Sequence, residues 1–435
     1  MNAERLARTV IAKLRASGHQ AWLVGGCVRD LLLGTAPKDY DVATDARPDR
    51  ILDLFPRSGR VGAHFGVILV RDAFSQVEVA TFRSDDEYID GRRPTAVHFE
   101  TDPRQDVLRR DFTINGLLLD PDTGGVLDFV GGQDDLRRKL VRAIGDPGAR
   151  FGEDHLRLLR AIRFAARLGF EIDAATFDAI RRHHALILTV SAERIRDELA
   201  RILTEGGARR GFELLDESGM LGDILPEIAA MKGVEQPPQY HPEGDVWVHT
   251  LLLLEQLRHP TLTLALGALL HDVGKPPTFH VAERIRFDGH VEAGVELTYD
   301  ILTRLRFSRD EIERVAALVA NHMRFKDVDR MKESTLKRFL RLPDFDEHLE
   351  LHRLDVLSSN RNLSTYELVK RKLHELPDDQ LKPDRLLTGA DLIAAGYHPG
   401  PQFSRMLAAV EDAQLEGRVL TTHDAIELVR REFPQ

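Results

Sequence analysis

Asp39 and Asp41 stand two residues apart in the segment KDYDVAT, which we interpret as an extended strand that follows a break at Gly34. Because alternate side chains of an extended segment leave the same face, both carboxylates are expected to point the same way. Two hard oxygen donors side by side suit Mg²⁺, which binds a few carboxylates together with substrate phosphates. The pair therefore indicates two-metal transfer of a nucleotidyl group, with Mg²⁺ as the cofactor.

The residues before these aspartates predict a site for phosphate groups. An apolar strand over residues 21–24 ends at Gly25 and Gly26, and a helix is expected to begin at residue 27. Free N–H groups and the positive dipole at a helix start attract an anion, and Arg29 adds a forked donor. Each feature alone is more often structural, but their order along the chain favours a functional site.

Two further segments bring charge to the same region. Glu78 lies in the alternating segment QVEVA and would place a third carboxylate on a neighbouring strand, although an exposed edge-strand face gives the same pattern. Arg109 and Arg110 open the segment RRDFTIN, and a triphosphate needs a cationic partner of this kind. The structural alternative is that the two arginines lie at the start of a helix and face solvent.

The segment EDHLRLLRAIRF, residues 153–164, has the apolar spacing of a helix, on which Asp154 and Arg157 would be neighbours. Cytosine and adenine both present an amino donor beside a ring acceptor, whereas uracil and guanine reverse that order. A carboxylate that accepts and a guanidinium that donates therefore fit C and A and reject U and G. The structural alternative is an intrahelical ion pair worth a few tenths of a kcal/mol.

Beyond a proline-rich linker at residues 236–242, histidines and aspartates recur in a second pattern. They are His249, the pair His271-Asp272 in LLHDVGKP, and Asp355, with His290 and His322 as weaker candidates. Imidazole and carboxylate ligands suit a transition-metal ion that activates water. Among 18 histidines some will be neighbours by chance, so a purely structural helical domain is the alternative.

The segments GGCVRD, KDYD, RRDFTIN and EDHLRLLRAIRF, in this order, resemble the motifs of bacterial class II tRNA nucleotidyltransferases of the poly(A) polymerase superfamily. The stretch LLTGADLIAAGYHPGPQFSRML resembles the tail of that family, and LLHDVGKP resembles the HD phosphohydrolase superfamily. The resemblance implies addition of C, C and A, or of the terminal A only, to the 3′ end of tRNA from CTP and ATP.

The resemblance also implies roles for individual residues. The implied catalytic residues are Asp39, Asp41 and Glu78, the first two as Mg²⁺ ligands. The implied nucleotide-binding residues are Gly25, Gly26, Arg29, Arg110, Asp111, Asn115, Asp154, Arg157, Arg160 and Arg163. The implied ligands of a metal in the HD domain are His249, His271, Asp272 and Asp355.

Three other functions compete with tRNA end addition. The chain could act mainly, or also, as an HD-type metal phosphohydrolase on RNA ends or nucleotides. A poly(A) polymerase is less favoured, because residues 61–66 read VGAHFG where that family carries an arginine-rich element and because an HD domain follows. A noncatalytic RNA-binding protein is disfavoured because the charged motif residues are intact.

The polar segment at 83–94 resembles the loop that assists addition of the final A in this family. This resemblance argues against an enzyme that adds only the two C residues. A simple surface loop is the default interpretation of the segment.

Composition is consistent with these expectations. The chain has 435 residues, of which 43% are hydrophobic and 30% charged, and a single cysteine, which fits a reducing compartment. No apolar run reaches the length of a membrane span, so we expect a cytoplasmic protein without a membrane partner. The net charge is −10, yet residues 137–210 hold 16 Lys and Arg against 10 Asp and Glu, which could form a surface for RNA phosphates or only a solvated helical face.

These features predict an α+β protein. Residues 1–145 are expected to form a nucleotidyltransferase head, a mixed sheet with helices that the resemblance makes polymerase-β-like. Residues 146–235 are expected to form an all-helical neck and body for nucleotide selection and tRNA binding, residues 243–365 a helical HD domain, and residues 366–435 a helical tail. The sequence gives no indication of the oligomeric state.

Overall fold

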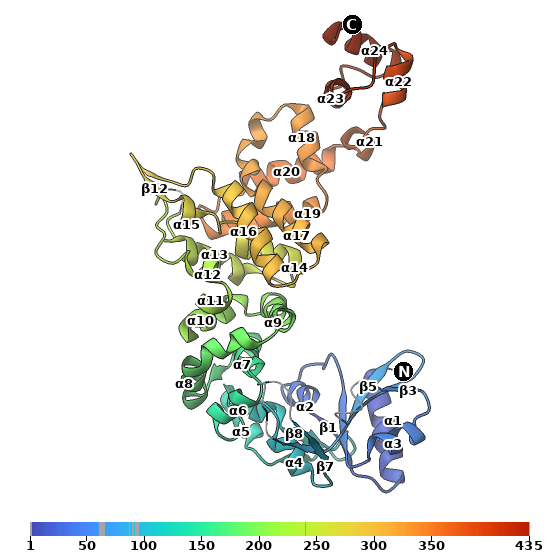
Figure 1. Ribbon diagram of the computed structural model, residues 1–435, viewed down its shortest axis with the longest axis vertical. Helices are drawn as coiled ribbons and strands as arrows, with labels where there is room; N and C mark the ends of the chain where they lie inside the picture. The colour runs from blue at the N-terminus through green and yellow to red at the C-terminus, as the bar shows by residue number, and fades with distance from the viewer. Residues whose placement is uncertain are drawn as a thin grey trace. The chain divides into compact units, whose positions relative to one another are not determined.

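The structure is a computed structural model that describes residues 2–60, 66–86, 88, 91, 95–239 and 241–434. The chain divides into two compact units (Figure 1). The first unit comprises Met1–Ala229 with Arg304–Phe307, and the second comprises Ala230–Thr303 with Ser308–Gln435. Residues 61–65, and residues 87, 89, 90 and 92–94 of the expected 83–94 loop, lie outside the described part, so the interpretations of these segments remain predictions.

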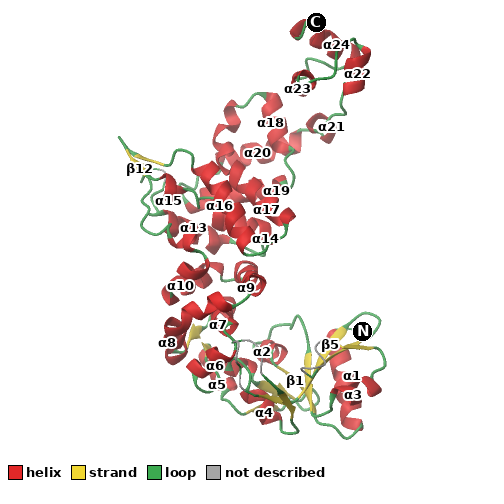
Figure 2. Ribbon diagram, viewed as in Figure 1, coloured by secondary structure: helices red, strands yellow, loops and turns green. Residues whose placement is uncertain are grey.

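The first unit begins with a seven-stranded sheet and the helices that pack on it, as expected for an α+β head (Figure 2). The strand order is β3-β4-β5-β2-β1-β8-β9, and only β2 and β5 run parallel to each other. Its elements are α1 Ala3–Ala16, β1 Ala21–Val24, α2 Gly26–Leu32, β2 Asp41–Thr44, α3 Pro48–Leu54, β3 Ser58–Arg60, β4 Val67–Arg71, β5 Gln76–Thr81, β6 Arg83–Asp85, β7 Val97–Phe99, α4 Pro103–Leu108, the 3₁₀ turn Thr113–Asn115, β8 Leu117–Leu119, β9 Val126–Asp128, α5 Gly132–Arg138 and β10 Leu140–Val141.

The sheet is held by apolar side chains that alternate along its strands. On β5 the exposed, buried, exposed, buried pattern of its first four residues buries Val77 and Val79 and leaves Glu78 exposed. An apolar cluster of Val24, Ala43, Phe82, Val107 and Leu118 includes one residue from each of β1, β2 and β8 of the sheet. The predicted strand at 21–24, the glycine turn and the following helix are all confirmed.

The rest of the first unit is helical with two departures from expectation. The elements are α6 Pro147–Glu153, α7 Leu156–Leu168, β11 Glu171–Ile172, α8 Ala174–His183, the 3₁₀ turn His184–Thr189, α9 Ala192–Thr204, α10 Ala208–Ser218, α11 Met220–Ile224 and α12 Pro226–Ala229. The expectation of helix throughout 146–235 is wrong at β11, which pairs in parallel with β10. It is also wrong at Asp154, which has extended backbone angles and separates α6 from α7.

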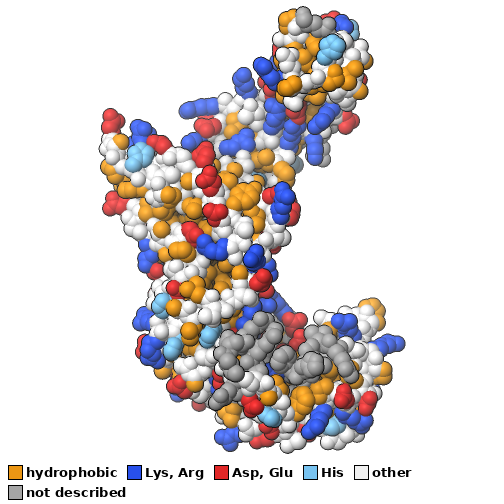
Figure 3. Space-filling view, viewed as in Figure 1, with side chains coloured by type: hydrophobic (Ala, Val, Ile, Leu, Met, Phe, Trp, Pro, Cys, Tyr) orange, Lys and Arg blue, Asp and Glu red, His pale blue; other side chains and the backbone are white. Residues whose placement is uncertain are grey.

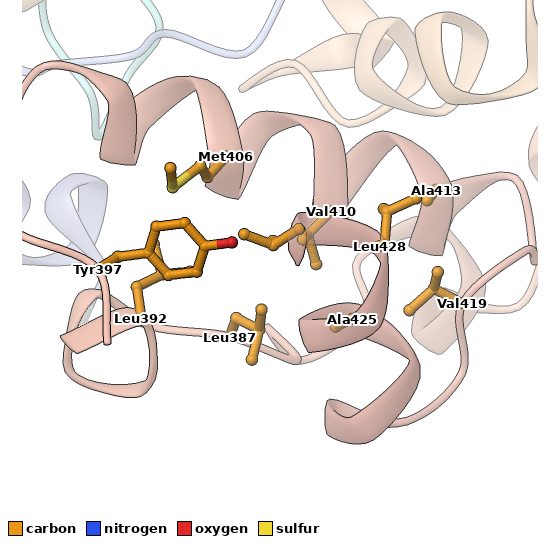
Figure 4. Close-up of a cluster of buried hydrophobic side chains, with 10 residues drawn as sticks. Leu387, Leu392, Tyr397, Met406, Val410, Ala413, Val419, Ala425 and Leu428 are labelled. Carbon is orange, nitrogen blue, oxygen red and sulfur yellow. The ribbon is translucent and has the colours of Figure 1, made fainter. Parts of the chain in front are cut away.

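The second unit is almost entirely helical, as expected. Its elements are α13 Val246–Gln256, α14 Leu262–Leu270, α15 Lys275–Thr278, β12 His280–Val281, β13 Ile285–Arg286, α16 His290–Arg304, α17 Arg309–Asn321, the 3₁₀ segment His322–Arg330, α18 Glu333–Leu340, α19 Phe345–Ser358, α20 Ser364–Glu375, α21 Asp378–Leu381, α22 Gly389–Ala394, α23 Gln402–Leu415 and α24 Thr422–Glu432. Figure 4 shows the small core of the last helices, in which Tyr397 and Met406 pack together; the Tyr397 hydroxyl donates to the carbonyl of Phe433 at 3.0 Å.

Charged side chains of both signs are interspersed over the face shown in Figure 3. In the basic stretch at 137–210, several arginines are engaged in ion pairs with acidic neighbours, such as Arg163 with Glu198 and Arg209 with Glu213. These pairs lower the number of cations in this stretch that are available to RNA phosphates. Within the described residues, no helix is both long enough and apolar enough to cross a lipid bilayer.

Candidate active sites

Parallel pairing of β2 with β5 sets the carboxylate of Asp41 beside that of Glu78. The two residues are direct register partners, and Asp41 is the first residue of its strand. Asp39 lies before the strand and is exposed, so the expectation that both aspartates belong to an extended strand holds for Asp41 only. Burial and repulsion from Glu78 raise the pKa of Asp41 to about 6, although Arg110 opposes that rise.

This charge distribution fits a divalent cation. Asp41 is destabilised in its ionised form by burial and by two other carboxylates, and a bound cation would reverse that cost. Hard carboxylate oxygens are the donors that Mg²⁺ prefers. Three groups of described residues have metal-ligand atoms within 4.8 Å of one another, and none of them includes Asp39, Asp41 or Glu78. The head carboxylates are thus neighbours without forming a closed cage.

The glycine turn after β1 leaves room for an arginine. Gly25 has a φ of 77°, and a Cβ atom there would lie 3.3 Å from Nη1 of Arg110. Arg110 and Arg109 both bind the buried carboxylate of Asp106, Arg110 through Nη2 at 2.8 Å and Arg109 through Nε at 3.0 Å. Asp106 was missed by sequence reasoning; its signal was an acid on α4 one turn before the arginine doublet.

Four predicted site residues form one hydrogen-bonded network. Arg29 donates to Asn115 Oδ1 at 2.7 Å, and Asn115 donates to Asp111 Oδ1 at 3.1 Å. Asp111 Oδ2 accepts two bonds from Arg160, at 2.9 and 2.5 Å. Arg29 is buried and also contacts Asp30, so its described contacts position the turn, and direct phosphate binding by Arg29 remains a prediction.

Phe164 lies at the centre of three predicted arginines and was not singled out from the sequence. The guanidinium carbons of Arg29, Arg160 and Arg163 lie 5.1, 5.3 and 4.2 Å from its ring centroid. These distances are those of cation–π contacts. Arg163 is buried and also pairs with Glu198 at 2.5 Å, so its described contacts are those of a structural residue.

The side chains of Asp154 and Arg157 have separate partners, although the N–H of Arg157 donates to the carbonyl of Asp154 at 3.0 Å. Because Asp154 lies in the break before α7, the prediction that one helix carries both residues is wrong. Asp154 accepts from Nη2 of Arg194 at 3.1 and 2.9 Å. Arg157 pairs with Glu153 at 2.5 Å and donates to the carbonyl of Arg109 at 2.9 Å. Sequence reasoning missed Arg194, for which no local signal exists.

The second unit brings all six predicted histidines and aspartates together. His249, His271 and Asp355 have ligand atoms within 4.8 Å of one another, and so do Asp272, His290 and His322. His249 Nε2 lies 3.1 Å from Asp355 Oδ1 and 3.4 Å from His271 Nε2. The glycine of the HDVGK segment, Gly274, allows this assembly, because a Cβ there would lie 2.0 Å from the carbonyl of His290.

Backbone carbonyls orient three of these imidazoles in the same manner. The Nδ1 atoms of His271, His290 and His322 contact the carbonyls of Ala268, Phe287 and Val319 at 3.0, 2.9 and 2.7 Å. Each Nδ1–H that donates in this way leaves Nε2 as the lone-pair atom. The Nε2 atoms of His290 and His322 are buried without a hydrogen-bond partner among the described residues. Unpaired imidazole nitrogens facing carboxylates fit a transition-metal ion.

Glu243 and Lys275 each contact one residue of this histidine and aspartate cluster. Glu243 Oε1 lies 2.7 Å from His249 Nδ1 and 2.9 Å from His241 Nδ1. Burial would lower the pKa of His249, but contacts with Asp355 and Glu243 raise it to about 9. Lys275 Nζ lies 2.7 Å from Asp272 Oδ2. A cavity of about 630 Å³ opens beside the cluster, lined also by Lys275, Arg284, Arg286 and Lys326.

Glu243→Gln is expected to weaken metal binding by the second unit about 10- to 100-fold, because the amide no longer fixes and polarises His249. The measurement is a titration of the chelator-treated protein with Co²⁺, followed by the visible ligand-field absorption. Glu235→Gln, at an exposed position nearby, is the matched control and should leave the titration unchanged. Equal Co²⁺ affinity in the wild-type and Glu243→Gln proteins would contradict this role.

Comparison with known proteins finds similarities that cover both candidate sites. The poly A polymerase head domain matches residues 21–142, the probable RNA- and SrmB-binding site of polymerase A matches residues 169–232, and the HD domain matches residues 245–395. A CC-adding tRNA nucleotidyltransferase of Thermus thermophilus is 35% identical over 93% of this chain and 92% of its own length. The chain belongs to the tRNA nucleotidyltransferase family.

Other members of the tRNA nucleotidyltransferase family show the same extent of similarity. The CCA-adding enzyme of Leuconostoc mesenteroides is 30% identical over 98% of this chain and 96% of its own length. The crystal structure of the Bacillus stearothermophilus CCA-adding enzyme in complex with CTP superposes with a TM-score of 0.76 at 25% identity, covering 98% of this chain and 97% of that one. The predicted family and the predicted fold class are therefore confirmed.

Proposed function

We propose that this chain adds C, C and A, or the terminal A only, to the 3′ end of tRNA, with CTP and ATP as donors. The observation that carries the proposal is the in-register pair of Asp41 and Glu78, which lies with Arg110 beside the glycine turn. The family's relatives named for CCA or CC addition support the substrate class. We place the reaction in the cytoplasm, where tRNA ends are matured.

The head residues divide the chemistry between them. Asp39 and Asp41 would hold Mg²⁺, which when bound neutralises phosphate charge and activates the attacking 3′ oxygen. Arg110, fixed by Asp106, offers its remaining donors to the triphosphate beside Gly25 and Gly26. Asp154 accepts from the exocyclic amine of C or A, and Arg157 donates to the adjacent ring nitrogen.

The experiment offers tRNAs that end at the discriminator base, at C and at CC, each with CTP, with ATP or with both. Extension of all three to a complete CCA end identifies full addition. Extension of the CC end with ATP alone identifies a terminal-A enzyme. Arrest after two C residues would reject the final A and match the activity named for the Thermus thermophilus relative. A long run of A residues would instead indicate a poly(A) polymerase.

Replacing Asp154 or Arg157 with Ala is expected to relax the choice of base. Correct addition slows because the carboxylate or guanidinium partner of C and A is lost, and discrimination against UTP and GTP falls by about 10- to 100-fold. The measurement is the ratio of kcat/KM for CTP to that for UTP on one tRNA substrate. A proportional decrease for all four nucleotides would contradict the side-chain template.

We also infer a second activity, hydrolysis of phosphomonoesters or of 2′,3′-cyclic phosphates at RNA ends, in the second unit. The support is the convergence of imidazole Nε2 atoms on Asp272 and Asp355, next to a cavity with basic side chains. A divalent transition metal there would activate water for attack on phosphorus. His249, His271, Asp272 and Asp355 are its proposed ligands, and His290 and His322 complete the set on the side of Asp272.

A further inference from the structure

Arg194 holds the carboxylate of Asp154 from a separate helix. Arg194 lies in the first turn of α9, and its Nη2 donates to both oxygens of Asp154, at 3.1 and 2.9 Å. Oδ1 also accepts the N–H of Leu156 at 3.1 Å. The side chains of Arg194 and Asp154 are 24% and 21% exposed, so water competes only in part for this contact.

The position of Asp154 makes this support necessary. Its backbone is extended, with φ −141° and ψ 106°, and it lies between two helices. Its carbonyl accepts the N–H of Arg157 at 3.0 Å, but that backbone bond does not fix the orientation of the carboxylate. Arg157, in contrast, is anchored separately, through Glu153 and the carbonyls of Arg150 and Arg109. The two groups of the base-reading pair are thus oriented by different elements, and α9 orients the acceptor.

The shape of the contact leaves Asp154 able to read a base. A carboxylate has about four lone-pair directions on its two oxygens. One nitrogen of Arg194 uses one direction on each oxygen, and the Leu156 N–H uses a second direction on Oδ1. Oδ2 therefore keeps acceptor capacity for the exocyclic amine of cytosine or adenine. Arg194 restricts the rotation of the carboxylate without exhausting it as an acceptor.

We propose that Arg194 is a positioning residue for base selection, acting through Asp154. The proposal rests on the proposed function, because it takes Asp154 as the group that accepts from the base. Without Arg194 the carboxylate rotates freely and contacts the amine in only a fraction of its conformations. Addition of C or A should then slow, whereas misincorporation of U or G, which gains nothing from this acceptor, should change little.

The test compares Arg194→Ala, Arg194→Lys and the control Arg196→Ala. Arg196 lies two residues further along α9 and contacts Asp197 and the carbonyl of Arg306 instead. We expect Arg194→Ala to lower the kcat/KM ratio of CTP over UTP about 10- to 100-fold. Arg194→Lys should recover part of that loss, because an ammonium group keeps one contact with Asp154, and Arg196→Ala should keep the wild-type ratio.

A double variant separates positioning from folding. If Arg194 acts through Asp154, the Asp154→Ala, Arg194→Ala protein should discriminate no worse than Asp154→Ala alone. A thermal melt of each variant tests folding independently of activity. The proposal is overturned if Arg194→Ala or Arg194→Lys slows all four nucleotides equally, or if the two substitutions are additive. Failure of the wild-type chain to add C or A to any tRNA end would overturn the proposed function together with this inference.

Discussion

Asp41→Asn should abolish nucleotide addition while stabilising the folded protein. The loss of rate is expected to reach about 10³-fold or more, which corresponds to about 4 kcal/mol of the activation barrier, because a charged metal ligand becomes a neutral one. The gain in stability follows from the environment of Asp41, where burial and the carboxylate of Glu78 disfavour the ionised form. Activity and stability are thus predicted to move in opposite directions.

The stability effect has a defined pH range. The folded-state pKa of Asp41 is raised to about 6 from an unfolded value near 3.8, so between these values the folded protein binds the proton more tightly than the unfolded one. The contribution of Asp41 to the free energy of unfolding therefore falls as the pH rises from about 4 to 6. Above pH 6 Asp41 is ionised, and the folded protein carries the full destabilisation from its burial and from Glu78. Asn carries no charge, so the variant should exceed the wild type by roughly 1–3 kcal/mol at pH 7.5 and by little at pH 4.

Urea unfolding at the two pH values, without added metal, measures the difference. Asp53→Asn, at an exposed site on α3, controls for the loss of one negative charge and should change neither activity nor stability. Asp39→Ala should abolish addition too, yet leave the unfolding free energy within about 0.5 kcal/mol because Asp39 is exposed. Appreciable turnover by the purified Asp41→Asn or Asp39→Ala protein would reject the assignment.

A His271→Ala, Asp272→Ala double variant should lose all hydrolysis of RNA-end phosphates and keep nucleotide addition. Both residues are buried, and their loss removes a ligand from two of the three groups of possible metal ligands in the second unit. The head carboxylates belong to the first unit and are untouched. Hydrolysis is measured on a 2′,3′-cyclic phosphate and on a phosphomonoester with Ni²⁺, Mn²⁺, Co²⁺ or Mg²⁺ supplied.

Removal of Asp272 leaves the buried Lys275 without its carboxylate partner. An unpaired buried charge destabilises the fold whether or not a metal binds there. Asp355→Asn is therefore the milder companion variant, since the side chain of Asp355 is 23% exposed and the amide preserves its volume. It should lose hydrolysis and bound metal with an unchanged melting temperature. Absence of metal from the purified wild-type protein, together with no hydrolysis under any of the four ions, would reject the activity.

Local sequence signals were sufficient for the elements around the glycine turn. Strand, turn and helix at 21–32 follow from an apolar run, two glycines and renewed helical spacing, and the alternation at 76–80 correctly exposes Glu78. The extended angles of Asp154 were not predictable in the same way. Its partner Arg194 lies 40 residues away in the sequence, and no local pattern of residues indicates such a contact.

The supporting residues were the hardest to foresee. Asp106 and Glu243 touch no predicted substrate and belong to none of the recognised segments, and each acts through a side chain that sequence reasoning had already named. Glu243 reaches His249 across six residues that include a helix start, so no periodic pattern links them. Positioning groups are fixed by the folded geometry, whereas the residues that do the chemistry are marked by their type.

The bonds from Arg29 through Asn115 and Asp111 to Arg160 fasten the glycine turn to α7. Hydrogen bonds between side chains therefore join the glycine turn, beside the proposed Mg²⁺ ligands, to the helix that carries the proposed base-reading residue Arg157. If the chain adds both C and A, as proposed, we do not expect the choice of base to change by a swing of α7 against the glycine turn, because that motion would leave Arg29 and Asp111 without their partners. Under the proposed function, a change from C to A addition would then depend on the position of the RNA end or on rotation of individual side chains.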